Sequence, residues 1–351
     1  MDRARTEHAE IRALGLWKTG QVLARAFSEQ RSCMRAVYGM AAELVRAPRG
    51  TAAGFDVRLG EIPAAFFTPR KNLFSTLFYS IYLVLGVPKP RRTLYGKLNH
   101  LFRIWVTSAD NLLDDEDKCV LPLVMPGASR VMREVVVIMA ADRVLGRMLA
   151  EAVAAKAVTA EQADALSEHS LRRLLPSAAQ EAGEEGGIRA RPSPEEVLDT
   201  VHVLKTGLLF TLPFLGVDLV ETGADAERVA RLKRALMLFG GGCQLLDDVR
   251  DVGRDFVERR HNYVLSVLAR DRPGVLQEWA ARDIGPGDRL YRETLPVCED
   301  AARLGFQKLV DACGLLQAEG VLPREAPVAR IASSMFTVLD VEDLAYAAAP
   351  D

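Results

Sequence analysis

The stretch 244-QLLDDVRDVGRDFVERRHNYV-264 carries three acids one helical turn apart, Asp247, Asp251 and Asp255. On a helix these acids share one stripe, with Gln244 among them and Asp248 at its edge. Like charges four residues apart cost roughly 0.2 to 0.5 kcal/mol per pair. A bound cation would relieve this repulsion, so the array indicates a cation site. The uncharged run ALMLFGGGCQLL before it indicates that the acids emerge from a buried helix. The alternative is a solvated helix end decorated with acids.

A second acidic cluster lies in 103-RIWVTSADNLLDDEDK-118, where another apolar helix ends in acids. Three of them fall on one helical face, Asp110, Asp114 and Asp117. Asp115 and Glu116 point away from that face. Near a helix C-terminus each acid also opposes the macrodipole, at a cost of about 0.3 to 1 kcal/mol. Two such clusters predict facing walls of one cavity that share bound divalent cations.

The chemistry of these clusters favours magnesium. Carboxylate oxygens without nearby histidine or cysteine suit a hard cation. Magnesium held by few carboxylates completes its shell with water and phosphate oxygens, so the site predicts a phosphorylated ligand. The candidate basic partners are Lys205 in VLKTGLLF, Arg254, Arg259 and Arg260. Alternatively, Lys205 is a snorkelling surface residue, and Arg254 and Arg259 are i, i+4 helical partners of nearby acids.

Composition bounds the remaining possibilities. The 351 residues are 49% hydrophobic and 26% charged, with a net charge of -2, which predicts a globular protein without a basic field for nucleic acid or anionic membranes. Five scattered cysteines without a CxxC pair argue against zinc or a disulfide framework, and indicate a reducing compartment. The charged N-terminus lacks a signal core, and no run reaches the ~18 apolar residues of a membrane span. We expect a cytoplasmic protein.

Apolar residues recur at helical spacing along almost the whole chain, which predicts an all-α fold in a single domain over 1–351. The glycine-rich, charged segment 180-QEAGEEGGIRARPSP-194 predicts a mobile loop over about 180–193. It leads into a helix that carries Lys205 and begins with a serine cap and a proline. The predicted helices span roughly 8–46, 72–85, 91–114, 128–155, 160–175, 194–216, 225–254, 262–269, 288–318 and 328–346.

Together these motifs resemble the class I isoprenoid synthases, an all-α superfamily whose two Asp-rich helices bind magnesium and a prenyl diphosphate. The segment 110-DNLLD-114 looks like the DDxxD motif, with Asn111 in place of the second Asp. The segment 205-KTG-207 is similar to the KTG of polyprenyl diphosphate synthases, and 244-QLLDDVRD-251 matches QxxDDxxD. The resemblance implies a helical bundle with a central apolar cavity, three bound Mg²⁺ ions and a prenyl diphosphate substrate.

The resemblance also implies roles for individual residues. The metal ligands would be Asp110, Asp114, Asp247, Asp251 and Asp255. The diphosphate would be bound by Lys205, Thr206, Gln244, Arg254, Arg259, Arg260 and Tyr263. The residues that carry catalysis would be Asp110, Asp114, Asp247, Asp251 and Lys205.

Three branches of the superfamily fit the second motif. Terpene cyclases use (N/D)D(L/I/V)x(S/T)xxxE, which 247-DDVRDVGRD-255 follows with acids at the last two positions. HNYV is similar to the HNxV that follows that motif. Squalene and phytoene synthases use DxxxD twice, and RDVGRD looks like their RDVGED. Elongating synthases use the QxxDDxxD form.

The choice among the branches depends on a second anion site. Elongating synthases hold isopentenyl diphosphate with a GGKRxRP stretch and an arginine pair, whereas 70-RKNLF-74 and 118-KCVLP-122 lack paired arginines. A magnesium-dependent terpene cyclase is therefore the leading interpretation, with aromatic side chains to shield carbocations. The aromatic candidates, which ordinary core packing also explains, are Phe74, Phe78, Tyr79, Tyr82, Phe102, Trp105, Phe210 and Phe214.

The alternatives are a prenyltransferase that condenses prenyl diphosphates, a head-to-head synthase and a non-catalytic helical protein. Against the cyclase, the chain ends without the RY pair common in bacterial cyclases, a role for which Arg259, Arg260 and Tyr263 are the candidates. A homodimer is a further possibility.

Overall fold

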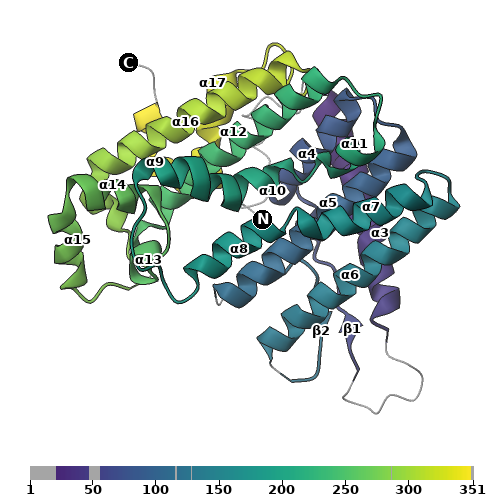
Figure 1. Cartoon of the computed structure of the whole chain (residues 1–351), viewed down its shortest axis with the longest axis horizontal. Coiled ribbons are helices and arrows are strands. Elements are labelled where there is room, and N and C mark those ends of the chain that lie inside the picture. Colours follow the sequence, from purple (N-terminus) through teal and green to yellow (C-terminus); the bar gives the residue numbers. More distant parts are fainter. Residues whose placement is uncertain (1–20, 47–55, 115–116, 128, 286, 349–351) are drawn as a thin grey trace. The chain divides into compact units, whose positions relative to one another are not determined.

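The computed structural model describes residues 21–46, 56–114, 117–127, 129–285 and 287–348, and helices dominate it (Figure 1). The prediction of an all-α fold is confirmed. By their internal contacts the described residues form two compact units, one within 21–170 and 212–224 and the other within 171–211 and 225–348. Within the described residues, no single helix combines the length and apolarity of a membrane span; the bent pair Pro194–Thr211 and Phe214–Val220 does so only jointly.

The first unit is built around long helices that pack on one another, α3 against α4, α5 and α6, and α5 against α6. Its elements are α3 (Gln21–Leu44), β1 (Arg58–Leu59), η1 (Ala64–Phe67), η2 (Arg70–Asn72), α4 (Leu73–Val84), α5 (Lys89–Leu113), β2 (Leu123–Val124), α6 (Arg130–Ala154), α7 (Ala160–Arg172, whose last two residues belong to the second unit) and α11 (Phe214–Val220). The strands β1 and β2 form a short antiparallel pair.

Buried tyrosines join the helices of this unit. The rings of Tyr79, Tyr82 and Tyr95 form successive edge-to-face pairs with centroids 5.7 and 5.4 Å apart. Tyr82 donates its hydroxyl hydrogen bond to the carbonyl oxygen of Pro213, at 2.8 Å. A Cβ on Gly216 would lie only 2.4 Å from the Tyr95 ring, so α11 needs glycine there to approach the ring this closely. Tyr79 and Tyr82 are thus core residues with satisfied hydroxyls.

The second unit centres on two long helices, α12 (Ala226–Arg250) and α16 (Leu295–Ala318), which pack closely against each other. A Cβ on Gly242 would lie 2.8 Å from the carbonyl oxygen of Gly305, so the two glycines let the backbones meet. The other elements are α8 (Leu175–Glu184), α9 (Pro194–Glu196), η3 (Val197–Val201), η4 (Val203–Gly207), α10 (Leu208–Thr211), α13 (Val252–Val257), α14 (Tyr263–Asp271), α15 (Pro273–Ala280), η5 (Leu290–Thr294), α17 (Val328–Val338) and η6 (Glu342–Ala348).

The helix predicted over 194–216 is interrupted. After the serine cap, where Ser193 accepts from Glu196 N, the helix widens into the π-helical turns η3 and η4. It then breaks before Pro213, which has no N–H to continue the ladder. Lys205 lies in the second π turn, a form of helix frequent at functional sites.

Several other boundaries differ from the prediction. Residues 180–184, predicted as loop, form the last turns of α8, because the buried Glu184 side chain anchors them. The helix predicted over 225–254 breaks at Asp251, and α15 and the β1–β2 pair were not predicted. The part of the first predicted helix over 8–20 lies outside the described residues. The single domain and the mobility of the loop stay predictions.

Candidate functional site

The first acidic cluster lies at the C-terminal end of α5. Asp110 and Asp114 are half-buried, and the backbone N–H of Asp114 donates to the carbonyl oxygen of Asp110 at 2.8 Å. The i, i+4 spacing puts both carboxylates on one face of the helix. Asp117, predicted on the same face, lies beyond the helix end, exposed and paired with Arg133. Asp115 and Glu116 lie outside the described residues.

Asn111, which replaces an acid of the motif, has a structural task. Its side-chain amide donates from Nδ2 to the carbonyl oxygen of Lys118, and its Oδ1 accepts from the Lys118 backbone N–H, both at 2.9 Å. The side chain is buried at 1% exposure. A carboxylate can only accept, so an ionised aspartate could make only one of these two bonds. Asn111 therefore fastens the chain beyond α5 back onto the helix.

A half-buried cation, Arg103, lies earlier on the same helix. Arg103 donates from Nη1 to Oδ1 of Asn72 at 3.0 Å, which ties α5 to the segment carrying Arg70 and Lys71. Burial lowers the pKa of Arg103, and within the described residues no carboxylate pairs with it. The seven-residue spacing puts Arg103 on the same side of α5 as Asp110. A partly desolvated guanidinium without a carboxylate partner favours an anionic ligand.

In the second unit, both carboxylate oxygens of Asp248 have hydrogen-bond partners. Its Oδ2 lies 2.8 Å from His202 Nε2 and accepts from the Tyr263 backbone N–H at 2.7 Å. Its Oδ1 accepts from Gln244 Nε2 at 2.9 Å. Burial alone would raise the pKa of Asp248, but His202 and these hydrogen bonds lower it below its ordinary value. Asp248 thus joins α12, the Lys205 helix and the start of α14.

Asp247 and Asp251 face arginines of their own helix end. The Arg250 guanidinium bridges the two carboxylates: Nη2 contacts Asp247 Oδ1 and lies 2.7 Å from Asp251 Oδ2, while Nε donates to Asp251 Oδ1 at 2.8 Å. Arg254 adds a bond from Nη2 to Asp251 Oδ2 at 3.1 Å. Desolvation raises the pKa of Asp247 to about 6. Repulsion from Asp251 and Asp248 raises this pKa further, whereas attraction to Arg250 lowers it.

Asp255, in α13, is buried. Its Oδ2 accepts from Asn262 Nδ2 at 2.8 Å, and Asn262 also donates to the backbone oxygen of Asp248 at 2.6 Å. Desolvation raises the pKa of Asp255 well above its ordinary value, although the Asn262 bond lowers it. The pair Asp255 and Asn262 therefore fixes the turn between α13 and α14.

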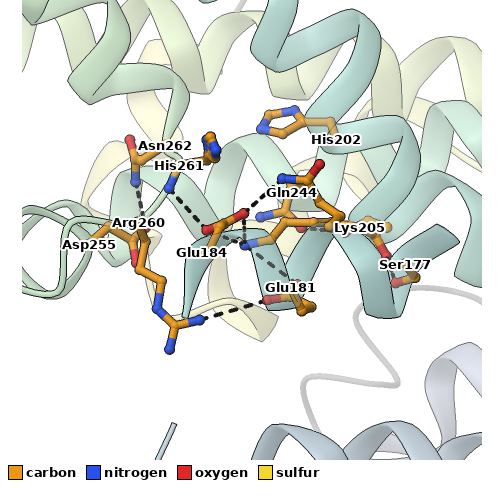
Figure 2. A network of polar contacts seen from close by, with 12 residues as sticks. Ser177, Glu181, Glu184, His202, Lys205, Gln244, Asp255, Arg260, His261 and Asn262 are labelled. Carbon is orange, nitrogen blue, oxygen red and sulfur yellow. Dashed lines mark hydrogen bonds and ion pairs between the residues drawn. The ribbon is translucent and has the colours of Figure 1, made fainter. Parts of the chain in front are cut away.

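Lys205, in η4, belongs to a polar network that includes two acids of α8 (Figure 2). Its amine is 3.0 Å from Glu184 Oε1 and 3.5 Å from Glu181 Oε1. Glu184 also accepts from the His261 backbone N–H at 3.0 Å, so one carboxylate holds α8, the Lys205 helix and the segment before α14 together. Burial by itself lowers the pKa of Lys205, but attraction to Glu184 and Glu181 outweighs it and raises the pKa above its ordinary value.

The remaining predicted diphosphate ligands lie around the same segments. Thr206 donates its hydroxyl hydrogen bond to Gln244 Oε1. Arg260 lies 3.7 Å from Glu181, whereas Arg259 points its Nη2 to the carbonyl oxygen of Gly186, at 2.7 Å. The Tyr263 ring is half-buried at the start of α14. The second unit thus gathers most of these side chains, and their binding roles stay predictions.

Sequence reasoning missed the partners that hold this unit together, Glu181, Glu184, His202, Arg250 and Asn262. The three glycines of 180-QEAGEEGG-187 favour a loop. The Gln180–Glu184 spacing, however, is that of a helical pair, with Nε2 of Gln180 donating to Oε1 of Glu184 at 3.1 Å. The position of Arg250, three residues after Asp247 and next to Asp251, was an available signal for an ion pair.

The two clusters differ in how they suit magnesium. Asp110 and Asp114 offer two partly exposed carboxylates on one face, a donor set that fits a hard divalent ion. In the second unit the carboxylates already contact arginines, His202 or Asn262, so that set does not fit a metal ion as it stands. Among the described residues, no group of three or more His, Cys, Asp or Glu is arranged to hold a metal.

Comparison with known proteins rests on structure. No family model and no curated protein matches the sequence. A decaprenyl diphosphate synthase from Rhodobacter capsulatus matches with a TM-score of 0.60 and 16% identity, over 91% of this chain and 98% of that one. The chain has the class I isoprenoid synthase fold.

Other structures with this fold give the same result. A geranylgeranyl pyrophosphate synthase from Lactobacillus brevis matches with a TM-score of 0.58 and 14% identity, over 89% of this chain and 96% of that one. A geranylgeranyl pyrophosphate synthetase from Pyrococcus horikoshii matches with a TM-score of 0.57 and 16% identity, over 94% and 99%. The isoprenoid synthase fold therefore extends over most of the chain.

Proposed function

We propose that this protein is a prenyltransferase that condenses an allylic prenyl diphosphate with a second, homoallylic diphosphate such as isopentenyl diphosphate. The observation that carries the proposal is Arg103, a half-buried cation without a carboxylate partner among the described residues. The names of the structural neighbours, which are diphosphate synthases, agree with it. The proposal replaces the cyclase as the leading interpretation.

Arg103 is our candidate for the second anion site, for which the sequence has no arginine pair. Its bond to Asn72 brings α5 next to 70-RKN-72, so two further cations adjoin it in the chain. Lys71 lies over the Phe66 ring, with its amine 5.4 Å from the ring centroid. A guanidinium that donates several hydrogen bonds in one plane suits a diphosphate better than a single lysine does. We assign the homoallylic diphosphate to Arg103.

The proposed mechanism divides the work between two diphosphates. Magnesium bound by Asp110 and Asp114 would neutralise charge on the allylic diphosphate. Within the second unit, Lys205 and Arg254 are the candidates to stabilise a diphosphate leaving group as its carbon–oxygen bond breaks, which is electrostatic catalysis. Arg103 holds the second substrate so that its double bond attacks the allylic carbon, and the released diphosphate accepts the proton lost afterwards. The half-buried rings of Phe74, Phe78 and Trp105 exclude water from the cation.

A terpene cyclase remains the second candidate. The described residues 117–122 contain no arginine, and Asn111 already binds the Lys118 backbone. A cyclase would use the same leaving-group chemistry on a single substrate. The two candidates share the allylic site and differ in the need for a second diphosphate.

Product analysis separates them. We expect purified protein with Mg²⁺ and farnesyl diphosphate to form longer prenyl diphosphates only when isopentenyl diphosphate is present. Arg103→Gln should raise the KM for isopentenyl diphosphate about tenfold or more, because a charge-assisted contact is lost. Arg143→Gln, at an exposed position of α6, is the matched control. Cyclic hydrocarbon or alcohol formed from farnesyl diphosphate alone would establish the cyclase instead.

We also propose a homodimer and a cytoplasmic location. Val131, Val135 and Met139 are exposed at i, i+4 and i+8 on α6, an apolar stripe that a second copy would cover. Light scattering on the wild-type protein and on Met139→Asp tests the dimer, since a monomer in both would contradict it. The four buried free cysteines agree with a reducing compartment.

A further inference from the structure

The second acidic cluster carries its own cation. The Arg250 guanidinium lies between Asp247 and Asp251, the two carboxylates whose i, i+4 spacing would otherwise let them share a metal ion. It uses Nη2 toward both and Nε toward Asp251. Arg254 makes a second contact with Asp251. Two guanidinium groups thus balance two carboxylates before any ligand arrives.

The neighbouring acids leave little for a metal. Asp248 accepts hydrogen bonds at both oxygens and faces His202. Asp255 is buried and bonded to Asn262. The Asp247 side chain keeps 35% of its surface exposed, but one of its oxygens contacts Arg250. A divalent ion would therefore have to displace Arg250 to reach two carboxylates at once.

We propose that Arg250, assisted by Arg254, is the resident cation of this cluster and takes the place of a divalent metal ion there. The inference rests on the proposed diphosphate-binding function. Guanidinium groups bind phosphate oxygens through directed hydrogen bonds, so Arg250 can receive diphosphate while Asp247 and Asp251 hold it in position. Metal binding then belongs to Asp110 and Asp114, and the protein needs fewer ions than the three that the resemblance implied.

Arginine, rather than lysine, suits this position. The planar fork reaches two carboxylates from one side chain and stays charged at any working pH. A lysine at 250 would provide one compact charge and only part of the bridge. We therefore expect Arg250→Lys to lie between the wild type and Arg250→Gln in the experiment below.

Direct metal binding tests the proposal. Mn²⁺ binding to the full-length protein is measured by electron paramagnetic resonance, with inorganic diphosphate present. We expect Arg250→Gln to bind at least one more Mn²⁺ ion than the wild type, or to bind Mn²⁺ about tenfold more tightly, because the competing cation has been removed. Arg234→Gln, an exposed arginine on the same helix, should behave as the wild type. Asp247→Asn added to Arg250→Gln should abolish the gain.

Variants in the wild-type background complete the test. We expect Asp247→Asn alone to leave the number of bound Mn²⁺ ions unchanged and Asp110→Asn to reduce it. A loss of Mn²⁺ in Asp247→Asn, or no gain in folded Arg250→Gln, would overturn the proposal. If Arg250→Gln does not fold, the number of Mn²⁺ ions bound by Asp247→Asn decides: an unchanged number supports the proposal and a lower number overturns it. Failure of the proposed function is a separate result, seen as unchanged Mn²⁺ binding in Asp110→Asn or as absent prenyl transfer.

Discussion

Replacing Asn111 with aspartate would restore the acid of the DDxxD motif and should destabilise the protein. The change removes the donor that bonds the Lys118 carbonyl oxygen at 2.9 Å, while the Lys118 N–H can still donate to the new carboxylate. Loss of one hydrogen bond costs about 1 kcal/mol. Burial at this position, where Asn111 is 1% exposed, should raise the pKa of the new acid.

The pKa change adds to the cost at neutral pH. A rise of one to two units corresponds to about 1.4 to 2.7 kcal/mol, so we expect Asn111→Asp to lose about 2 to 4 kcal/mol in free energy of unfolding. Because the folded pKa lies above the unfolded one, the destabilisation is present at high pH. It should shrink as the pH falls through the folded pKa, where the protonated acid can donate again.

Urea unfolding of wild type and variant at pH 7.5 and pH 4.5 measures both parts of this prediction. Asp110→Asn, which removes a charge next to the same position without touching the Lys118 bonds, is the control. A variant as stable as the wild type at pH 7.5, or one whose deficit does not shrink at pH 4.5, would refute the assignment of Asn111 as a structural fastener.

Two other perturbations follow from buried ion pairs. Glu184→Gln should cost about 3 kcal/mol in unfolding free energy, because Lys205 keeps only Glu181 at 3.5 Å; equal stability by urea titration would show that the pair contributes nothing. Glu29, whose pKa the Arg92 bonds lower to about 2 despite desolvation, should lose up to about 3 kcal/mol of stabilisation as the pH falls from 4.5 to 2. Glu29→Gln should flatten that part of the pH profile, and an unchanged slope would contradict the assignment.

The sequence predicted the helices well because their apolar spacing follows directly from the helical repeat. It also located the residues that the second unit gathers, since Lys205, Gln244 and Asp248 lie in motifs whose spacing is local. The sequence did not reveal which side chains form ion pairs and hydrogen bonds with these residues. Glu184 lies 21 residues from Lys205, and His202 lies 46 from Asp248, so neither contact leaves a local pattern.

Arg103 is a candidate site residue that no sequence motif marks. A second anion site made of paired arginines would be visible in the sequence, whereas the fold brings Arg103 to Asn72 from 31 residues away. The structural role of Asn111 is likewise not visible in the motif, because its two bonds to Lys118 depend on how the chain turns after α5. Ligand-like roles of single residues depend on such tertiary contacts.

The π-helical turns have a consequence for tracing the ancestry of this chain. In η3 and η4 the backbone N–H groups of His202 and Leu208 donate to carbonyl oxygens five residues earlier, at Val197 and Val203. Each such turn absorbs an inserted residue locally, so the helix on either side keeps its own phase. A sequence alignment that assumes a regular α-helix from Ser193 to Lys205 would assign Lys205 to the wrong helical face. In a comparison with related sequences, alignment gaps are therefore expected inside this helix.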